Sequence, residues 1–218
     1  MTPVILFEDK FVVVTVKPAG TESQASKSGN DMLSLLSERT GGSLYPVHRL
    51  DRDTVGVMVY AKTEKAAASL SGAFANGKTD KRYLAVTLGS PTEKEGTFKD
   101  LLYHDAKRNK TFVVDKKRGG VKEASLSYSV IKALDGEKSP TLVSIRLHTG
   151  RTHQIRVQFA SHKTPLYGDA RYGGKVEGTN KMALACVSLS FPHPDSGESM
   201  TFTYSPEGGI WDSFSEVL

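Results

Sequence analysis

The chain has 218 residues, 38% of them hydrophobic and 24% charged, with a net charge of +5. These proportions are ordinary for a soluble globular protein, and the chain is long enough to bury a core without disulfide staples. The single Cys186 excludes an internal disulfide and a cysteine-based metal site, which fits a reducing compartment. No apolar run approaches the ~20 residues that span a bilayer. The N-terminus lacks a signal-peptide pattern, so we expect a cytoplasmic protein with no membrane partner.

The first half of the chain predicts two strands and two helices. A β-branched run at 11–16 ends in a turn and is followed by a polar loop at 20–30. Helical spacing of apolar residues predicts a helix over 31–39, which Gly41-Gly42 ends. A strand follows at 55–61. Thr63 then begins a helix as its N-cap, and this helix runs to about residue 76, with Gly77 as its C-terminal stop.

The second half is predicted to be mainly strands. Apolar and alternating patterns place them at 83–88, 111–114, 124–134, 142–147, 183–191 and 200–204. A short helix is predicted over 152–161. Because strands outnumber helices and the spacings suit antiparallel connections, we predict one α+β domain covering residues 1–218.

The positive charge is concentrated in residues 99–122, which we call the basic segment. It holds eight Lys or Arg residues against three acids, so it carries +5 and the rest of the chain sums to zero. Such an asymmetry is typical of a surface that binds a polyanion. A solvated surface with no partner explains the charge alone equally well.

Two further clusters of residues are candidates for chemistry. His48, Arg49, Asp51, Arg52 and Asp53 crowd the entrance of the predicted strand 55–61. The neighbouring arginines favour the ionised form of Asp51. Such a carboxylate is a candidate nucleophile or base, and capping a turn is the structural alternative.

The third cluster is T-G-R-T-H-Q-I-R at 149–156, where a glycine turn opens a short helix. Ile155 and Phe159 point to the core, which places Arg156 on the helix flank. A guanidinium there needs a carboxylate or phosphate partner, because an unpaired buried charge is very costly.

Six blocks of the sequence, in order, resemble the RluA family of pseudouridine synthases. They are K-P-A-G at 17–20, H-R-L-D-R-D-T-V-G at 48–56, K-R-Y-L-A at 81–85, T-G-R-T-H-Q-I-R-V-Q at 149–158, P-L-Y-G-D-A-R-Y-G at 165–173 and L-S-F-P-H-P at 189–194. Three positions depart from the family pattern. Val55 replaces the Ser of T-S-G, Ala185 replaces the His of L-H-A, and Gln158 replaces the final His of the fourth block.

The resemblance implies a pseudouridine synthase catalytic domain, with a mainly antiparallel sheet flanked by helices and loops around a central cleft. The implied reaction converts uridine in RNA to pseudouridine and needs no cofactor and no metal. Asp51 is the implied catalytic carboxylate, and Arg156 the arginine that pairs with it. Tyr83 is the aromatic residue implied to stack on a flipped base, and Arg49 the residue implied to fill the space that base leaves. The alternative for Arg49 is a plain salt bridge to a neighbouring Asp.

We expect the partner to be a stem-loop of ribosomal or transfer RNA, bound by a monomer without a separate N-terminal RNA-binding domain. The residues predicted to hold RNA, together with Arg49, are Arg151, Lys107, Arg108, Lys110, Lys116, Lys117 and Arg118. Two alternatives stay open. One is a catalytically silent RNA-binding protein on the same fold. The other is a glycosidase, for which Asp51 lacks a clear second carboxylate.

Overall fold

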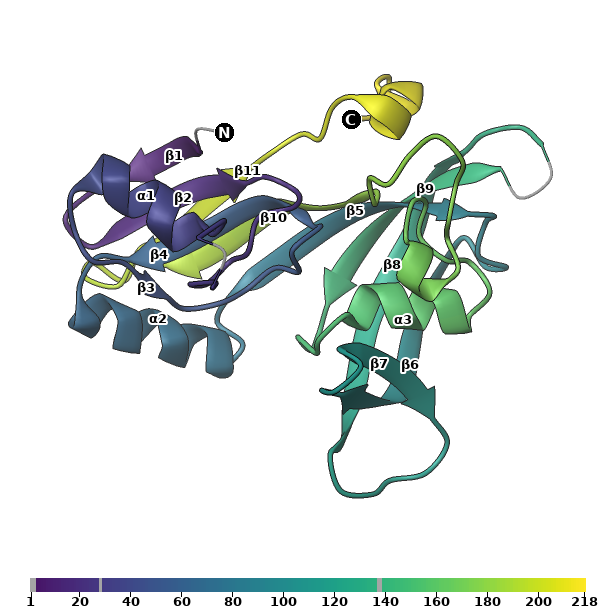
Figure 1. The fold of residues 1–218 in the computed structure, drawn as a ribbon, viewed down its shortest axis with the longest axis horizontal. Coiled ribbons are helices and arrows are strands. Elements are labelled where there is room, and N and C mark those ends of the chain that lie inside the picture. The colour runs from purple at the N-terminus through teal and green to yellow at the C-terminus, as the bar shows by residue number, and fades with distance from the viewer. Residues whose placement is uncertain (1–2, 28, 137–138) are drawn as a thin grey trace. The chain divides into compact units, whose positions relative to one another are not determined.

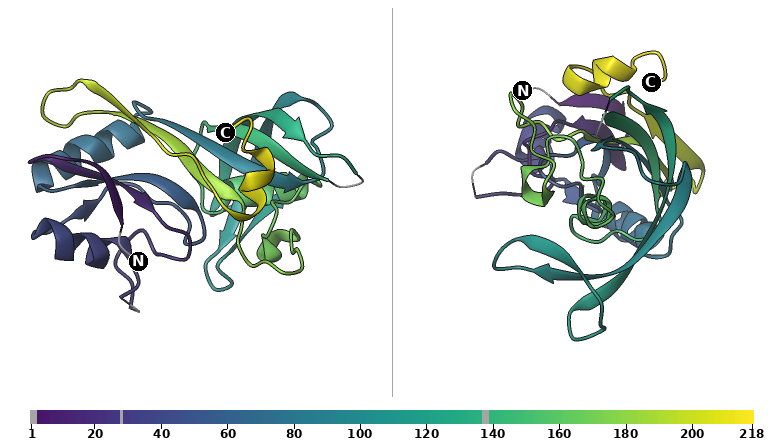
Figure 2. Two further views of the ribbon diagram at one scale, coloured as in Figure 1. Left: turned by 90° about the horizontal axis from the view of Figure 1, so that it is seen from above. Right: turned by 90° about the vertical axis from the view of Figure 1, so that its right-hand side faces the viewer.

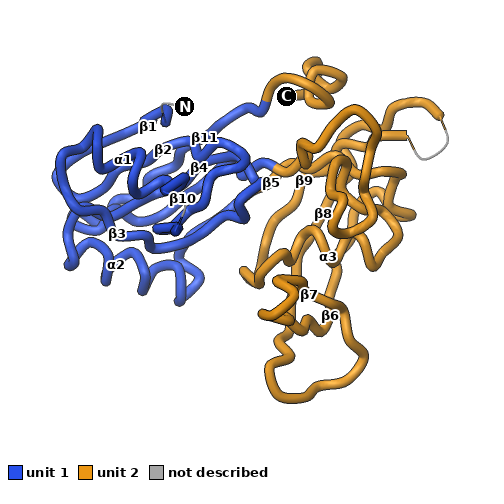
Figure 3. Tube along the Cα trace, viewed as in Figure 1, with its two compact units in different colours: residues 1–81, 185–206 blue, residues 82–184, 207–218 orange. Residues whose placement is uncertain are grey.

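The computed structural model describes residues 3–27, 29–136 and 139–218 (Figure 1). The chain divides into two compact units (Figure 3). Unit 1 comprises residues 1–81 and 185–206, and unit 2 comprises residues 82–184 and 207–218. Each unit has strands, helices and buried apolar residues of its own, and each is described here by itself.

Unit 1 is built on a mixed sheet. Its strands are β1 (Val4–Glu8), β2 (Val12–Lys17), β3 (Tyr45–Pro46), β4 (Val55–Ala61), β10 (Leu184–Pro192) and β11 (Ser199–Thr203). They follow the order β1-β2-β4-β10, with β3 also paired to β4 and β11 to β10. The pairing of β4 with β10 is parallel, and the other pairings are antiparallel. Alternate residues of β2 and β4 join an apolar cluster with Leu189 and Phe191 of β10.

The two helices of unit 1 begin and end at residues with the expected capping chemistry. Helix α1 (Met32–Thr40) starts at Asp31, whose side chain accepts a hydrogen bond from the Ser34 N–H, and it ends at Gly41 with φ 67°. Helix α2 (Glu64–Ala75) starts at Thr63, whose hydroxyl accepts from the Ala66 N–H at 3.1 Å. Both helices therefore stop where local sequence predicts.

Unit 2 holds an antiparallel sheet in the order β5-β9-β8-β6-β7. The strands are β5 (Asp80–Leu88), β6 (Glu95–Asp105), β7 (Lys110–Val114), β8 (Val121–Ala133) and β9 (Pro140–Leu147). Helix α3 (Gln154–Ser161) lies inside the curve of this sheet, as Figure 2 shows. Two 3-10 helices, η1 (Ala170–Tyr172) and η2 (Gly209–Phe214), complete the unit.

The α+β class and the mainly antiparallel sheet are confirmed. Three details of the predicted elements were wrong. The short strands β1 and β3 were not predicted, and neither was the long strand β6, which begins at Glu95, ahead of the basic segment. Helix α3 begins at Gln154 because the preceding His153 adopts φ 54°, outside the helical region. Among the helices of the described residues, none is long and apolar enough to cross a membrane.

Candidate active site

Asp51 lies in the loop that leads into β4. Its carbonyl oxygen accepts a hydrogen bond from the Thr54 N–H at 3.0 Å, which closes a turn immediately before the strand. Asp51 is half-buried, while Arg49 and Asp53 are exposed and Leu50 is buried. The turn therefore anchors the backbone of Asp51 without burying its carboxylate completely.

The last residue of β2, Lys17, and Ser23 in the loop after it hold the turn on both sides of Asp51. The buried Nζ of Lys17 donates to the carbonyl oxygens of Pro18 (3.0 Å), Thr21 (2.8 Å) and Arg52 (2.8 Å). The hydroxyl of Ser23 donates to the Leu50 carbonyl at 2.8 Å and accepts from the Leu50 N–H at 3.0 Å. The neighbours of Asp51 on either side are thus tied to the end of β2 and the loop after it, which restricts the position of the carboxylate.

His48 is a structural residue of this region. Its Nε2 accepts a hydrogen bond from the Val59 N–H at 3.1 Å, and its ring stacks on Phe74 with centroids 4.6 Å apart. Burial lowers the pKa of His48 well below 6.5, and the charge of Lys81 lowers it further. The ring therefore stays neutral and serves as an acceptor inside unit 1.

Tyr83 occupies the middle of β5 in unit 2, opposite Ile145 of β9. It is only 4% exposed, so its ring belongs mostly to the interior in this structure. The neighbouring Arg82 is exposed and lies opposite Arg146. Stacking of Tyr83 on a flipped base stays a prediction.

The turn that opens α3 is organised by the side chain of Gln154. Its Oε1 accepts from the Thr149 hydroxyl at 2.8 Å and from the Arg151 N–H at 3.0 Å. Its Nε2 donates to the Ser125 carbonyl at 3.1 Å. One amide therefore fixes the T-G-R-T turn and joins it to β8.

Helix α3 is buried on more faces than its apolar spacing suggests. Gln154, Arg156 and Gln158 are buried together with the apolar residues between them. Gln158 donates to the Asp100 carboxylate at 2.7 Å, and its own Oε1 accepts no hydrogen bond from the described residues. The departure from the family's His at this position therefore places an amide beside a carboxylate of β6.

Arg156 forms a bidentate ion pair with Asp169. Nε lies 2.7 Å from Oδ2 and Nη2 lies 2.9 Å from Oδ1, with both side chains buried. The sequence indicated that this guanidinium needs a carboxylate and assigned that role to Asp51. In the structure Asp169, 13 residues along the chain, accepts from Nε and Nη2 of Arg156. The pairing of Arg156 with Asp51 stays a prediction.

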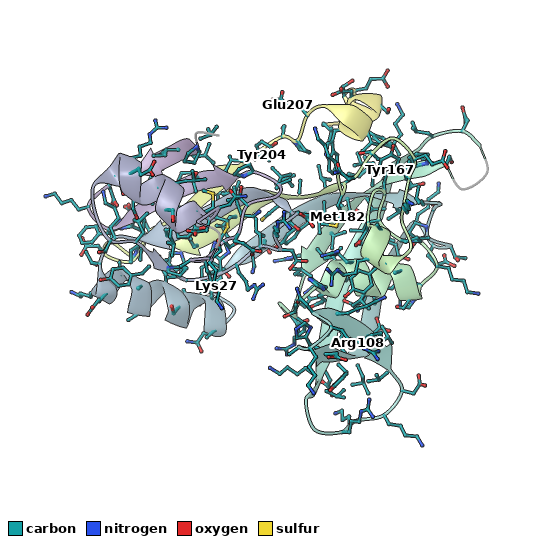
Figure 4. All side chains as sticks on the ribbon, viewed as in Figure 1. Lys27, Arg108, Tyr167, Met182, Tyr204 and Glu207 are labelled. Atoms are coloured by element: carbon teal, nitrogen blue, oxygen red, sulfur yellow. The ribbon has the colours of Figure 1, made fainter. Side chains whose placement is uncertain are left out.

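The basic segment forms β6, β7 and the turns around them, and Figure 4 marks Arg108 within it. Most of its predicted RNA-contacting side chains are exposed, and Lys110 is half-buried. Lys117 pairs with Glu123 at 2.5 Å, and the Arg118 guanidinium lies 5.2 Å from the centre of the Tyr103 ring. Arg151, outside the segment, is exposed and donates to the Glu123 carbonyl at 3.0 Å.

Asp51 and Arg49 belong to unit 1, whereas Tyr83, Arg156 and the basic segment belong to unit 2. The structure brings Asp51 together with Lys17 and Ser23, and it brings Arg156 together with Asp169. Sequence reasoning gave no role to these three partners. The signal for Lys17 and Asp169 was the block match alone, at 17–20 and 165–173, and Ser23 lies outside every matched block. Among the described residues, no cluster of His, Cys, Asp or Glu has the arrangement of a metal site.

Comparison with known proteins agrees with this set of blocks. The profile of the RNA pseudouridylate synthase family matches residues 11–161. Ribosomal large subunit pseudouridine synthase D of Zymomonas mobilis is 34% identical, over 91% of this chain and 67% of its own length. An uncharacterised RNA pseudouridine synthase of Aquifex aeolicus is 36% identical over the same shares. The chain thus spans about two thirds of the length of these relatives.

A solved structure, human RNA pseudouridylate synthase domain containing 1, shares the fold with a TM-score of 0.79. It is 22% identical, and the match covers 94% of this chain and 84% of the human chain. The chain belongs to the RluA family of RNA pseudouridine synthases. It is therefore an enzyme of the isomerase class.

Proposed function

We propose that this chain converts uridine to pseudouridine in ribosomal RNA, with Asp51 as the catalytic carboxylate. The observation that carries the proposal is the anchored turn, in which Lys17 and Ser23 hold the backbone on both sides of Asp51. The matched block H-R-L-D at 48–51 supports the same assignment. The name of the Zymomonas relative supports large-subunit ribosomal RNA as the substrate.

The reaction breaks the bond between the base and carbon 1′ of the ribose, turns the base, and joins carbon 1′ to carbon 5. The hydrogen on carbon 5 is then released as a proton, and N1, freed from the sugar, takes up a proton, so the isomerisation balances without an oxidant or reductant. An ionised Asp51 either attacks the sugar, attacks the base, or removes a proton from the sugar. All three routes need a carboxylate held in one place.

We assign supporting roles to three residues. Arg156 stabilises the charge of Asp51, and its own orientation is fixed by the pair with Asp169. Tyr83 stacks on the target base, which offsets ~1–3 kcal/mol of the cost of flipping it. Arg49, exposed next to the anchored turn, fills the space that the flipped base leaves.

The RNA backbone binds to the exposed charges of unit 2. Arg151 and the basic segment supply them, with Lys107, Arg108, Lys110, Lys116, Lys117 and Arg118 as contacts to phosphates. We expect a stem-loop as the target, and a cytoplasmic monomer as the acting form.

Release of tritium from RNA labelled at carbon 5 of uridine tests the proposal. Unmodified ribosomal and transfer RNA are incubated separately with the wild type, Asp51→Asn and Asp53→Asn. Asp53 is the control, because it is an exposed carboxylate two positions away. We expect release from ribosomal RNA by the wild type and Asp53→Asn, and none by Asp51→Asn.

Release from transfer RNA only would show that the substrate is transfer RNA and not ribosomal RNA. If no protein released tritium while wild type and Asp51→Asn bound RNA equally, the chain would be the catalytically silent RNA-binding protein. Release by Asp51→Asn at the wild-type rate would remove Asp51 from the mechanism.

A further inference from the structure

Three side chains of residues 169–172 contact three different parts of unit 2. Asp169 binds Arg156 of α3, Arg171 binds the turn between β6 and β7, and Tyr172 binds the start of β7. All of them come from the block P-L-Y-G-D-A-R-Y-G, of which the proposed mechanism uses only Asp169, as the partner of Arg156. We call residues 169–172 the clamp.

Hydrogen bonds of its backbone and side chain within the same loop fix the position of Asp169. Its N–H donates to the Leu166 carbonyl at 3.1 Å, and its Oδ1 accepts from the Arg171 N–H at 3.2 Å. The preceding Gly168 has φ 78°, and a Cβ there would meet the Lys181 carbonyl oxygen at 2.1 Å. The backbone that positions the Asp169 carboxylate therefore requires glycine at position 168.

Tyr172 contacts both Arg156 and the basic segment. Its Oη accepts from the Thr111 N–H at 2.8 Å and lies 3.0 Å from Nδ1 of His153. The Arg156 guanidinium lies 5.2 Å from the centre of its ring, and Nζ of Lys110 lies 5.4 Å from it. One buried ring thus lies next to the proposed catalytic arginine and next to a predicted phosphate contact.

Arg171 completes the connection to the β6–β7 turn. Its Nη1 donates to the carbonyl oxygen of Asn109 at 2.7 Å and lies 3.4 Å from that of Arg108. Asn109 adopts φ 45°, the left-handed conformation that asparagine takes in tight turns. Arg171 therefore holds the turn that presents Lys107 and Arg108.

We infer that Asp169, Arg171 and Tyr172 are positioning residues that orient Arg156 and couple it to the β6–β7 turn. RNA phosphates bound at this turn then stabilise the arrangement in which Arg156 is aligned. The inference rests on the proposed function, because it assigns the clamp a role only if Arg156 serves catalysis. It predicts that damage to the clamp lowers the rate of the bound complex and does not merely weaken RNA binding.

Two measurements on each variant separate these effects. One is the RNA dissociation constant, and the other is the single-turnover rate of tritium release at saturating RNA. For Arg171→Ala we expect a rate roughly 2- to 30-fold lower, the size of a positional coupling. Asp169→Asn should lower the rate about 100-fold, because one acceptor of Arg156 becomes a donor and the guanidinium moves. Tyr172→Phe keeps the ring and loses only the hydroxyl contacts, so a smaller loss is expected.

The controls remove one cation and one carboxylate at other exposed positions of unit 2. Lys175→Ala removes an exposed cation three residues beyond the clamp, and Asp212→Asn changes an exposed carboxylate that caps a backbone N–H. Both should keep the wild-type rate. Thermal unfolding of every variant shows which ones fold. If Asp169→Asn does not fold, Arg171→Ala decides the matter, because Arg171 is exposed.

The inference is overturned if Arg171→Ala matches Lys175→Ala in rate at saturating RNA. It is also overturned if Arg171→Ala changes only the dissociation constant, as a simple phosphate contact does. An inactive wild type would instead contradict the proposed function, so the two failures are distinguishable.

Discussion

Val55 and Ala185 are register partners at the point where β4 and β10 pair in parallel. These two positions are also two of the three departures from the family pattern, which has Ser and His there. Partners in register lie next to each other on the sheet. Four residues after Asp51, an apolar pair has therefore replaced a polar pair, and the smaller Ala185 leaves room for the larger Val55.

A double-mutant cycle tests this compensation. Ala185→His should lower the free energy of unfolding by roughly 2–4 kcal/mol, because Ala185 is fully buried and the new ring lacks space and a partner. Adding Val55→Ser should restore about 0.5–2 kcal/mol of the summed loss. Urea denaturation of the four proteins measures the coupling, and strictly additive losses would show that the two departures are independent.

Gly56 is predicted to tolerate no side chain. It has φ 134°, and a Cβ would lie 2.2 Å from the carbonyl oxygen of its partner Cys186. Gly56→Ala should cost more than about 4 kcal/mol or prevent folding, since two backbones would have to separate. Gly72→Ala is the matched control, because Gly72 lies within α2 with open space around it. It should stabilise by about 0.5–1 kcal/mol, and thermal melting of both variants gives the comparison. Equal effects would contradict the steric account.

Lys17→Met should destabilise unit 1 and loosen the turn at Asp51. The substitution leaves three carbonyl oxygens without the donor that Lys17 provides. We expect a loss of roughly 2–4 kcal/mol at pH 7 by urea denaturation. A wild-type free energy of unfolding in the variant would show that the buried amine is dispensable.

The same pair of proteins gives a pH dependence. Burial lowers the pKa of Lys17 from 10.5 to about 8, against the opposing charges of Asp53, Glu22 and Asp51. Between these values the unfolded chain binds more protons than the folded chain, so the contribution of Lys17 to stability rises with pH. The difference in unfolding free energy between wild type and Lys17→Met should grow from pH 8 to 10.5. If the difference in unfolding free energy shrank over this range, the pKa of Lys17 would be raised by folding and not lowered.

His48 predicts sensitivity to mild acid. Burial lowers the pKa of its ring well below 6.5, so the stability it contributes is complete above pH 6.5 and is lost as the pH falls. The wild type should lose more unfolding free energy between pH 7 and 5.5 than His48→Gln. The glutamine carbonyl can still accept from the Val59 N–H but does not titrate. Parallel profiles for the two proteins would exclude His48 as the cause.

The basic segment predicts a strong salt dependence of RNA binding. Replacing Lys116, Lys117 and Arg118 by Gln should weaken RNA binding. The slope of log affinity against log salt is negative, and its magnitude should fall by about 2–3, near one unit for each phosphate contact. The control replaces Lys10, Lys65 and Lys78 of unit 1, which are also exposed, with the same change of net charge. Equal slopes in the two variants would show that net charge alone drives the interaction.

The sequence alone predicted those helices and strands whose ends are set by residues close by in the chain. The strand at 55–61 has the predicted bounds, and Thr63 and Gly41 cap their helices as expected. The reason is that hydrophobic period, N-cap hydroxyls and glycine at positive φ act within a few residues. The blocks around Asp51, Tyr83 and Arg156 are equally legible, because family motifs are read residue by residue.

Tertiary structure decided which groups meet. Asp169 reaches Arg156 across 13 residues, and Lys17 reaches the Arg52 carbonyl across 35. No periodicity predicts such pairs, because they depend on how strands and loops are stacked. The same holds for Gln158, which lies buried against Asp100, and for β1 and β3, which are held by pairing with β2 and β4. The sequence thus named Asp51 as the proposed catalytic carboxylate, while the contacts that hold the Asp51 turn and Arg156 in place came from packing.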